Sequence, residues 1–254
     1  MADAQPQVIA VKRIGRTLIL TLDRPTHRNA LDSATMRGLQ VWLEKAERDQ
    51  DVACVLLAGA PPGFCAGSDL KELALLDPGG MAGHEAETAA VVRRIAWLSK
   101  PVIAAVEGFA LGGGFILAVS CDVVVTGRDA RWRLPEVANG WLPPWGLGAL
   151  LARVGPARAR LLVWGAEQID GAEAHRLGVA DFLAEPGQAE TRALAVADAL
   201  AALPSSAVAS TKRFFEPFAA ADGERLDVAA SRAFVQDCTS PAAQATFARF
   251  GARL

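Results

Sequence analysis

The sequence predicts an α/β fold followed by a helical C-terminal module, and three observations lead to this prediction. Short apolar runs alternate with helical patterns along most of the chain, which is typical of α/β architecture with parallel strands. No composition break or Gly/Ser-rich linker divides the 254 residues, so one large unit is expected. After about residue 200 the pattern changes to alanine-rich amphipathic helices, which separates a core (1–200) from a C-terminal module (201–254).

The N-terminal elements follow from local patterns. Val8–Arg13 and Thr17–Leu22 flank Gly15-Arg16, and both runs alternate or are β-branched, which predicts a hairpin. Asp32-Ser33 begins a helix whose apolar residues recur every three or four positions. Short continuous apolar runs predict buried strands over Val52–Ala58, Pro101–Val106 and Cys121–Thr126.

The region between the first and second of these strands contains a helix breaker. Asp69–Leu76 predicts a short helix, which Asp77-Pro78-Gly79-Gly80 ends. We therefore expect a mobile loop as far as Thr88 and a helix over Thr88–Ser99. A further helix follows Gly112-Gly113-Gly114.

From Trp145 onwards the sequence predicts mostly helices, with one last strand over Val179–Phe182. The apolar periodicity and the glycine and proline breaks predict helices over 147–154, 156–164, 171–176, 188–202, 205–218, 224–237 and 241–250.

Charge and cysteine usage exclude several classes of protein. With 26 basic and 28 acidic residues, the chain lacks the basic excess of a nucleic-acid or membrane-surface binder. Its apolar runs are too short for a membrane span, and Met1–Gln7 has no signal-peptide pattern. The cysteines form no CxxC pair, so we expect buried free thiols in a cytoplasmic protein; they are Cys54, Cys65, Cys121 and Cys238.

Searches for several catalytic motifs fail. The chain has no GxxxxGK[ST] phosphate loop, and its glycine-rich stretch lacks dinucleotide-fingerprint spacing. The three histidines are widely separated, and His84-Glu85 is not followed by a second His at Thr88, so no metal site is expected. Ser68-x-x-Lys71 formally matches an acyl-serine motif, but its companion motifs are missing.

Two glycine-bearing turns have the features of a binding site. Gly63–Lys71 and Gly108–Phe115 each follow a buried strand and enter a helix. Glycine lets the backbone approach a ligand closely, and the first N–H groups of a helix are unpaired. Two such turns facing each other would offer two donors to a carbonyl oxygen that gains negative charge. Simple strand-to-helix turns explain the same pattern equally well.

These turns, with their order and spacing, resemble the enoyl-CoA hydratase/isomerase (crotonase) superfamily over nearly the whole chain. The segments that carry the resemblance are Arg24-Pro25-x-x-Arg28-Asn29-Ala30-Leu31-Asp32, Gly63-Phe64-Cys65-Ala66-Gly67-Ser68-Asp69-Leu70, Lys100–Gly108, Ala110-Leu111-Gly112-Gly113-Gly114, Cys121-Asp122, Pro135-Glu136 and Ala172–Ala180.

The resemblance implies a spiral of ββα turns with a helical C-terminal trimerisation module, and a homotrimer or a hexamer built as a dimer of trimers. It implies an acyl-CoA substrate, with coenzyme A as part of that substrate and no permanently bound cofactor. The oxyanion donors would be the backbone N–H groups of Ser68 and Gly113. The expected binding residues are Arg28, Ala30, Ala66, Ser68, Asp69, Leu70, Lys71, Gly113, Ile116 and Trp141.

The catalytic acids depart from the hydratase pattern. Hydratases of the family carry two glutamates; Glu136 matches one, and Ile116 stands at the position of the other. An isoleucine cannot hold a water molecule, whereas a single carboxylate can remove a proton beside the thioester and return it elsewhere. We therefore expect an isomerase that moves a double bond, with Glu136 as its sole acid/base and with a pKa raised by desolvation.

Other activities remain open alternatives. The nearest is a hydratase that works with one glutamate or takes a second acid from the 77–87 loop, with Glu85 or Glu87 as candidates. Thioester hydrolysis, C–C cleavage and a catalytically inactive CoA-binding protein are the others. Trp141 and Trp145 lie in a stretch where the family usually has small residues, from which Pro144, Trp145 and Leu147 depart. The two tryptophans either line the acyl pocket or belong to the core.

Overall fold

The computed structural model describes residues 8–165, 168–220 and 222–251, and it confirms the α/β fold. The strands in chain order are β1 (Ile9–Ile14), β2 (Thr17–Leu22), β3 (Cys54–Gly59), β4 (Val102–Val106), β5 (Phe109–Leu111), β6 (Val123–Gly127), β7 (Arg131–Arg133) and β8 (Phe182–Ala184). The helices are α1 (Ser33–Arg48), α2 (Leu70–Leu73), α3 (Pro78–Trp97), α4 (Gly113–Val119), α5 (Glu136–Asn139), α6 (Leu147–Trp164), α7 (Gly171–Arg176), α8 (Ala189–Ala201), α9 (Ser205–Ala220), α10 (Gly223–Cys238) and α11 (Pro241–Gly251), with a 3₁₀ turn at Pro25–His27.

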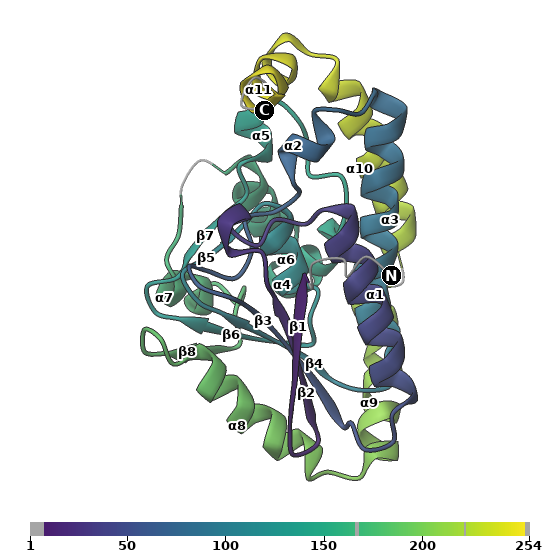
Figure 1. Cartoon of the computed structure of the whole chain (residues 1–254), viewed down its shortest axis with the longest axis vertical. Helices are drawn as coiled ribbons and strands as arrows, with labels where there is room; N and C mark the ends of the chain where they lie inside the picture. The colour runs from purple at the N-terminus through teal and green to yellow at the C-terminus, as the bar shows by residue number, and fades with distance from the viewer. Residues whose placement is uncertain (1–7, 166–167, 221, 252–254) are drawn as a thin grey trace, which may run out of the picture.

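A six-stranded sheet in the order β1-β2-β3-β4-β6-β8 forms the centre of the molecule (Figure 1). The predicted hairpin is confirmed, because β1 and β2 pair antiparallel across Gly15. Every other neighbouring pair in this sheet is parallel. The short strands β5 and β7 pair in a separate two-stranded sheet, which holds the second glycine turn beside the first.

Alternation along the central strands divides the core between the two faces of the sheet. On β3, Val55 and Leu57 face the larger cluster, which includes residues of α1, α4 and α6. Leu56 and Ala58 face the opposite side, where α8 packs through a row of alanines. Both faces are therefore buried, as expected for parallel strands that read as continuous apolar runs. All four cysteines are buried and free, as predicted.

The expected mobile loop before Thr88 is wrong. The structure has one helix, α3, from Pro78 to Trp97, and its apolar side chains pack into the core. Asp77 caps this helix by accepting a hydrogen bond from the Gly80 amide at 2.7 Å, and Pro78 occupies the first helical position, where its missing N–H costs nothing. Asp77-Pro78-Gly79-Gly80, which the pattern predicts to break a helix, therefore begins one.

Smaller differences concern the short elements. The last strand of the sheet lies at Phe182–Ala184 rather than Val179–Phe182. The patterns did not indicate β5, β7 or α5, which have three or four residues each. Helix α6 contains the predicted break, because Gly155 has a non-helical backbone with φ of 72°.

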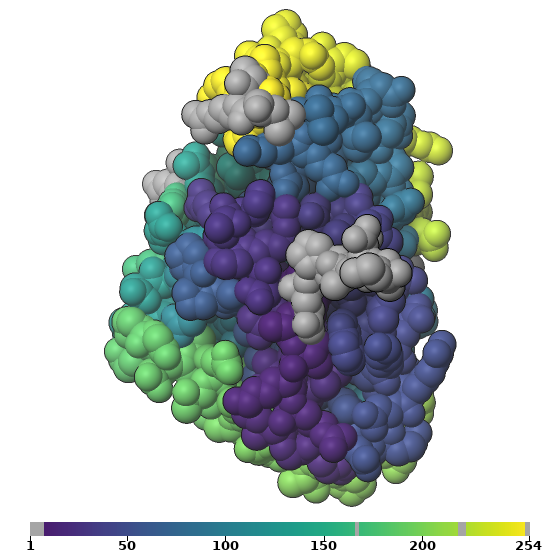
Figure 2. All heavy atoms as spheres, viewed as in Figure 1, coloured from purple at the N-terminus to yellow at the C-terminus, as the bar shows by residue number. Residues whose placement is uncertain are grey.

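The three helices after residue 204 pack against the core. Phe234 of α10 and Phe247 of α11 join Leu73 of α2 and Met81 of α3 in one apolar cluster. In the space-filling view, the yellow C-terminal helices lie directly on the blue α2–α3 region (Figure 2). In the described part of the chain no single helix meets the length and hydropathy of a membrane span, although the bent pair Ala189–Ala201 and Ser205–Pro217 does so jointly.

Candidate active site

The two glycine-bearing turns lie side by side. Cys65 donates its amide to the carbonyl of Phe109 at 3.3 Å, and Leu111 donates to the carbonyl of Cys65 at 2.9 Å. On the other side of the first turn, Leu31 donates to the carbonyl of Gly67 at 2.8 Å. The first turn is thus fixed between the 29–31 segment and the second turn, and main-chain hydrogen bonds set their relative position.

The amides of Ser68 and Gly113 come together where these turns meet. A methyl group on Gly113 would lie 3.4 Å from the Ser68 nitrogen, and one on Gly67 would lie 2.9 Å from the Gly113 nitrogen. Gly67 and Gly112 have φ of 94° and 53°, which favour glycine. Within the described residues neither the Ser68 nor the Gly113 N–H donates a hydrogen bond, so both are free to bind a ligand oxygen.

Arg24 and Asn29 hold the first turn in place, a role that the sequence pattern does not reveal. Arg24 forms ion pairs with Asp32 and Asp69, both at 3.0 Å. The buried Asn29 side chain donates to the carbonyls of Ala60 and Gly63 at 2.6 and 2.7 Å. Their place in the Arg24–Asp32 motif was visible, but the motif alone does not tell which residues hold the loop and which contact a ligand.

Glu136 begins α5, and its carboxylate lies against the second turn. A methyl group on Gly112 would be 2.8 Å from Glu136 Oε1. The carboxylate therefore lies next to Gly112, the residue that precedes the Gly113 amide in the chain. The side chain is buried, and its Oε2 atom has no hydrogen-bond partner within the described chain. Burial raises the pKa of Glu136 to about 8, as expected for a carboxylate in an apolar site, and the negative charge of Glu85 acts in the same direction.

A cavity of about 50 Å³ connects the acid to the two amides. It has room for a few water-sized groups. The residues of the predicted site that line it are Ala66, Ser68, Leu70, Gly113, Ile116, Glu136 and Trp141. In the described ranges no cluster of three or more His, Cys, Asp or Glu side chains is arranged to hold a metal ion.

Glu85 also lines this cavity, so Glu136 is not its only carboxylate, while the expectation of Glu136 as the sole acid/base stays a prediction. Glu85 lies on α3 and is 2% exposed, whereas Glu87 on the same helix is exposed to solvent. The indole N–H of Trp145 donates to Glu85 Oε2 at 2.5 Å. Glu85 and Glu87 are equivalent candidates in the sequence, because only the helix determines which of the two side chains points inward.

The two tryptophans differ in their surroundings. Trp141 stacks on Phe247 with ring centroids 4.9 Å apart and also lines the cavity, so it belongs to both the core and the site. Trp145 is buried with its ring over the second turn, since a methyl group on Gly113 would lie 3.1 Å from an indole carbon.

The other predicted binding residues lie outside the cavity lining. Arg28 and Lys71 are exposed, and the Arg28 guanidinium lies 4.7 Å from the centroid of the Phe109 ring. Ala30 is buried, and its carbonyl accepts a hydrogen bond from Arg24. The Asp69 carboxylate accepts from Arg24 at 3.0 Å and from the Lys71 amide at 3.1 Å, so it is already engaged within the protein.

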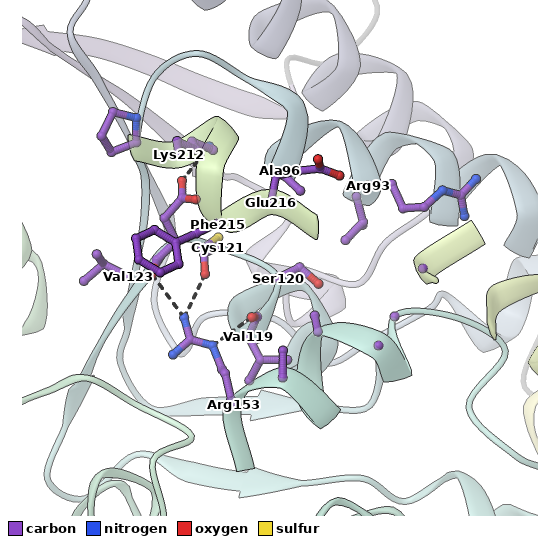
Figure 3. Close-up of a pocket in the computed structure, with 18 of the residues that line it drawn as sticks. Arg93, Ala96, Val119, Ser120, Cys121, Val123, Arg153, Lys212, Phe215 and Glu216 are labelled. Carbon is purple, nitrogen blue, oxygen red and sulfur yellow. Dashed lines mark hydrogen bonds and ion pairs between the residues drawn. The ribbon is translucent and has the colours of Figure 1, made fainter. Parts of the chain in front are cut away.

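A second, larger cavity of about 700 Å³ lies between α3, α6 and α9 (Figure 3). Lys212 at its edge donates to the carbonyls of Ile95 and Lys100 and to Asp122 Oδ2. Arg153 donates to the carbonyls of Val119 and Cys121, as the dashed lines in Figure 3 show. These cations are paired within the protein, and Glu136 does not line this cavity.

Fold and site together define a class of protein: an α/β chain in which two main-chain amides and a buried acid border one small cavity, as oxyanion chemistry requires. Comparison with known proteins agrees, because a family model described as enoyl-CoA hydratase/isomerase matches residues 15–245. The chain belongs to this enoyl-CoA hydratase/isomerase (crotonase) family.

Individual relatives support the assignment. A probable enoyl-CoA hydratase from Rhizobium meliloti (strain 1021) is 36% identical over 206 residues, covering 80% of this chain and 79% of that protein. A 2,3-dehydroadipyl-CoA hydratase from Escherichia coli (strain K12) is 39% identical over 173 residues, 67% of each chain. The structure of Pseudomonas aeruginosa OdaA matches with a TM-score of 0.85 at 29% identity, covering 96% of this chain and 98% of that one.

Proposed function

We propose that this chain is an enoyl-CoA isomerase, which moves the double bond of a 3-enoyl-CoA thioester to the 2-position. The observation that carries the proposal is the Glu136 carboxylate, buried with a free Oε2 atom beside Gly112 and the paired amides. Ile116 supports it, because this buried side chain lines the cavity where hydratases of the family have a second glutamate.

In this mechanism the thioester oxygen accepts hydrogen bonds from the Ser68 and Gly113 amides. Glu136 removes a proton from C2, and the electron pair spreads onto the oxygen as a dienolate. The two amides stabilise the charge that develops there. Protonation at C4 then places the double bond between C2 and C3. The raised pKa of Glu136 suits it to removing a carbon-bound proton near neutral pH.

The proposal is tested by offering purified protein 3-enoyl-CoA and 2-enoyl-CoA separately, separating the two isomers by chromatography and measuring product masses. Isomerisation of 3-enoyl-CoA leaves the mass unchanged, whereas hydration adds the mass of water. Conversion of 3-enoyl-CoA without added mass is expected. Water addition to 2-enoyl-CoA without migration would contradict the isomerase.

Hydration is the second candidate, and Glu85 is the observation that favours it. Adding water across C2=C3 requires one group to deprotonate the water and one to protonate C2, and the cavity offers two carboxyls. The two relatives described above are also named as hydratases. Thioester hydrolysis, C–C cleavage and CoA binding without turnover are distinguished by the same panel of substrates.

We also propose that the chain works in the cytoplasm as a homotrimer or as a hexamer of two trimers. Large apolar side chains on its surface support assembly, since Trp97, Trp164 and Leu203 are 66, 54 and 50% exposed. The four free cysteines suit a reducing compartment. Light scattering on the purified chain tests the assembly, and a monomer would contradict it.

A further inference from the structure

Glu85 is a buried carboxylate that the Glu136 mechanism does not use. It lines the same cavity as Glu136, although the two residues lie on different helices, α3 and α5. No lysine or arginine of the described residues lines this cavity. Burying a carboxylate without a cation is costly, so a chain that keeps one here needs groups that offset the cost.

Two residues of the site supply these groups. The Trp145 indole donates to Glu85 Oε2 at 2.5 Å. The Ser68 side chain lies near enough to Glu85 to lower the pKa of its carboxyl. Trp145, His84 and Ser68 all act to lower the pKa of Glu85, but burial outweighs them and the pKa is raised. Ser68 belongs to the first glycine turn and Trp145 to the 141–145 segment, and the structure brings both to one carboxyl.

Two carboxyls that share a small cavity without a cation do not ionise independently. The charge of Glu85 raises the pKa of Glu136, so a state with one proton between them is favoured over one with none. That state contains an acid and a base at the same time. A single shuttling carboxylate, in contrast, must release the proton from the group that has just accepted it.

We propose that Glu85 is the second proton-transfer residue of this site, which protonates the far end of the dienolate while Glu136 takes the proton from C2. This inference rests on the proposed function. The Glu136 carboxylate accepts the C2 proton, the electron pair moves through C3, and the Glu85 carboxyl gives its proton to C4. Glu136 is then protonated and Glu85 ionised, and transfer of one proton from Glu136 to Glu85 restores the starting state.

The two half-reactions are separated by following deuterium. Wild type, Glu85→Gln, Glu136→Gln and Glu87→Gln are each incubated with 3-enoyl-CoA in D₂O. Label at C2 of the recovered substrate reports proton removal, and formation of 2-enoyl-CoA reports complete migration. Glu87 is the matched control, because it lies on the same helix two residues away and is exposed.

Glu85→Gln should keep C2 exchange within a few-fold of wild type and lose migration by about 100-fold or more, the usual contribution of a general acid. Glu136→Gln should lose both, and Glu87→Gln neither. Retained exchange shows that Glu85→Gln is folded and binds substrate. Glu85→Asp keeps a carboxyl and should recover part of the migration rate.

Three outcomes would overturn the proposal. Migration at the wild-type rate in Glu85→Gln would show that Glu136 acts alone. Loss of exchange and migration together in both Glu85 variants would assign Glu85 a purely structural role. Wild type that neither exchanges nor migrates would refute the proposed function itself, and that result is distinct because it appears before any substitution is made.

Discussion

The two sides of the cavity are built in different ways. The amide side consists of main chain: two glycine turns, close in sequence to their strands, held by backbone hydrogen bonds. The acid side consists of side chains from α3, α5 and the 141–145 segment, which are remote from one another in the chain. The amide side needs only glycine conformation and strand pairing, whereas the acid side depends on how whole helices pack.

This difference predicts where substitutions act. On the acid side a single carboxyl can be removed without disturbing the backbone, so catalysis should fall while the fold remains. On the amide side even one added methyl group meets main-chain atoms, so geometry and catalysis should change together.

The largest effect is expected from Glu136→Gln. An amide of the same shape cannot accept the C2 proton, so we expect kcat to fall about 1,000-fold, within the range for a general base. Steady-state kinetics with 3-enoyl-CoA measures this, with binding of a saturated acyl-CoA as the control for an intact site. An activity within ten-fold of wild type would remove Glu136 from the mechanism.

The next effect, on the amide side, is expected from Gly67→Ala. The new methyl group would lie 2.9 Å from both the Gly113 nitrogen and the Leu111 carbonyl oxygen, at a backbone φ of 94°. We expect kcat to fall about 100-fold, as when an oxyanion donor is displaced. Gly83→Ala is the matched control, because nothing lies within 4 Å of the added carbon. Equal kinetics for the two variants would show that the amide pair is not used.

The amide side of the cavity can be predicted from the sequence, whereas the acid side can be predicted only in part. The hairpin, the buried strands and the glycine turns follow from local patterns, and the structure confirms them. Glu136 was found because it follows Pro135 in a recognisable order. That Glu85 lines the cavity could not be predicted, because the direction of its side chain depends on helix α3. This helix begins at Pro78, and Asp77 caps it. Short-range patterns do not reveal such packing of one helix against remote loops.

A moderate effect is expected on the pH dependence of activity. With a pKa of about 8 for Glu136 in the folded protein, the base form is the minor one at pH 7. The value of kcat/KM should therefore rise up to about ten-fold per pH unit below 8, and it should fall again at higher pH once Glu85 has also lost its proton. A flat profile of kcat/KM from pH 6 to 9 would contradict a base that ionises in this range. The residual activity of Glu136→Gln should not rise with pH below 8.

Stability should change in the opposite direction. The folded pKa of Glu136 lies above the unfolded value of 4.5, so the folded state binds more protons between pH 4.5 and about 8. The free energy of unfolding should fall as pH rises through this window, and Glu136→Gln should remove that loss. We expect the Tm of the variant at pH 8 to exceed that of wild type by about 5 °C. A lower Tm at pH 8 would mean that the charged form is stabilised by the fold.

The smallest effect is expected outside the cavity, at Lys71. This residue is exposed on α2 beside the first turn, and it does not itself line the cavity, although its neighbour Leu70 does. If it meets a phosphate of coenzyme A, Lys71→Ala should raise KM about three-fold with kcat unchanged, since an exposed ion pair contributes at most about 1 kcal/mol. The difference between variant and wild type should shrink as salt is raised, because screening weakens an exposed contact. A change in kcat instead of KM would place Lys71 on the reacting side and would break the division between main-chain recognition and side-chain chemistry.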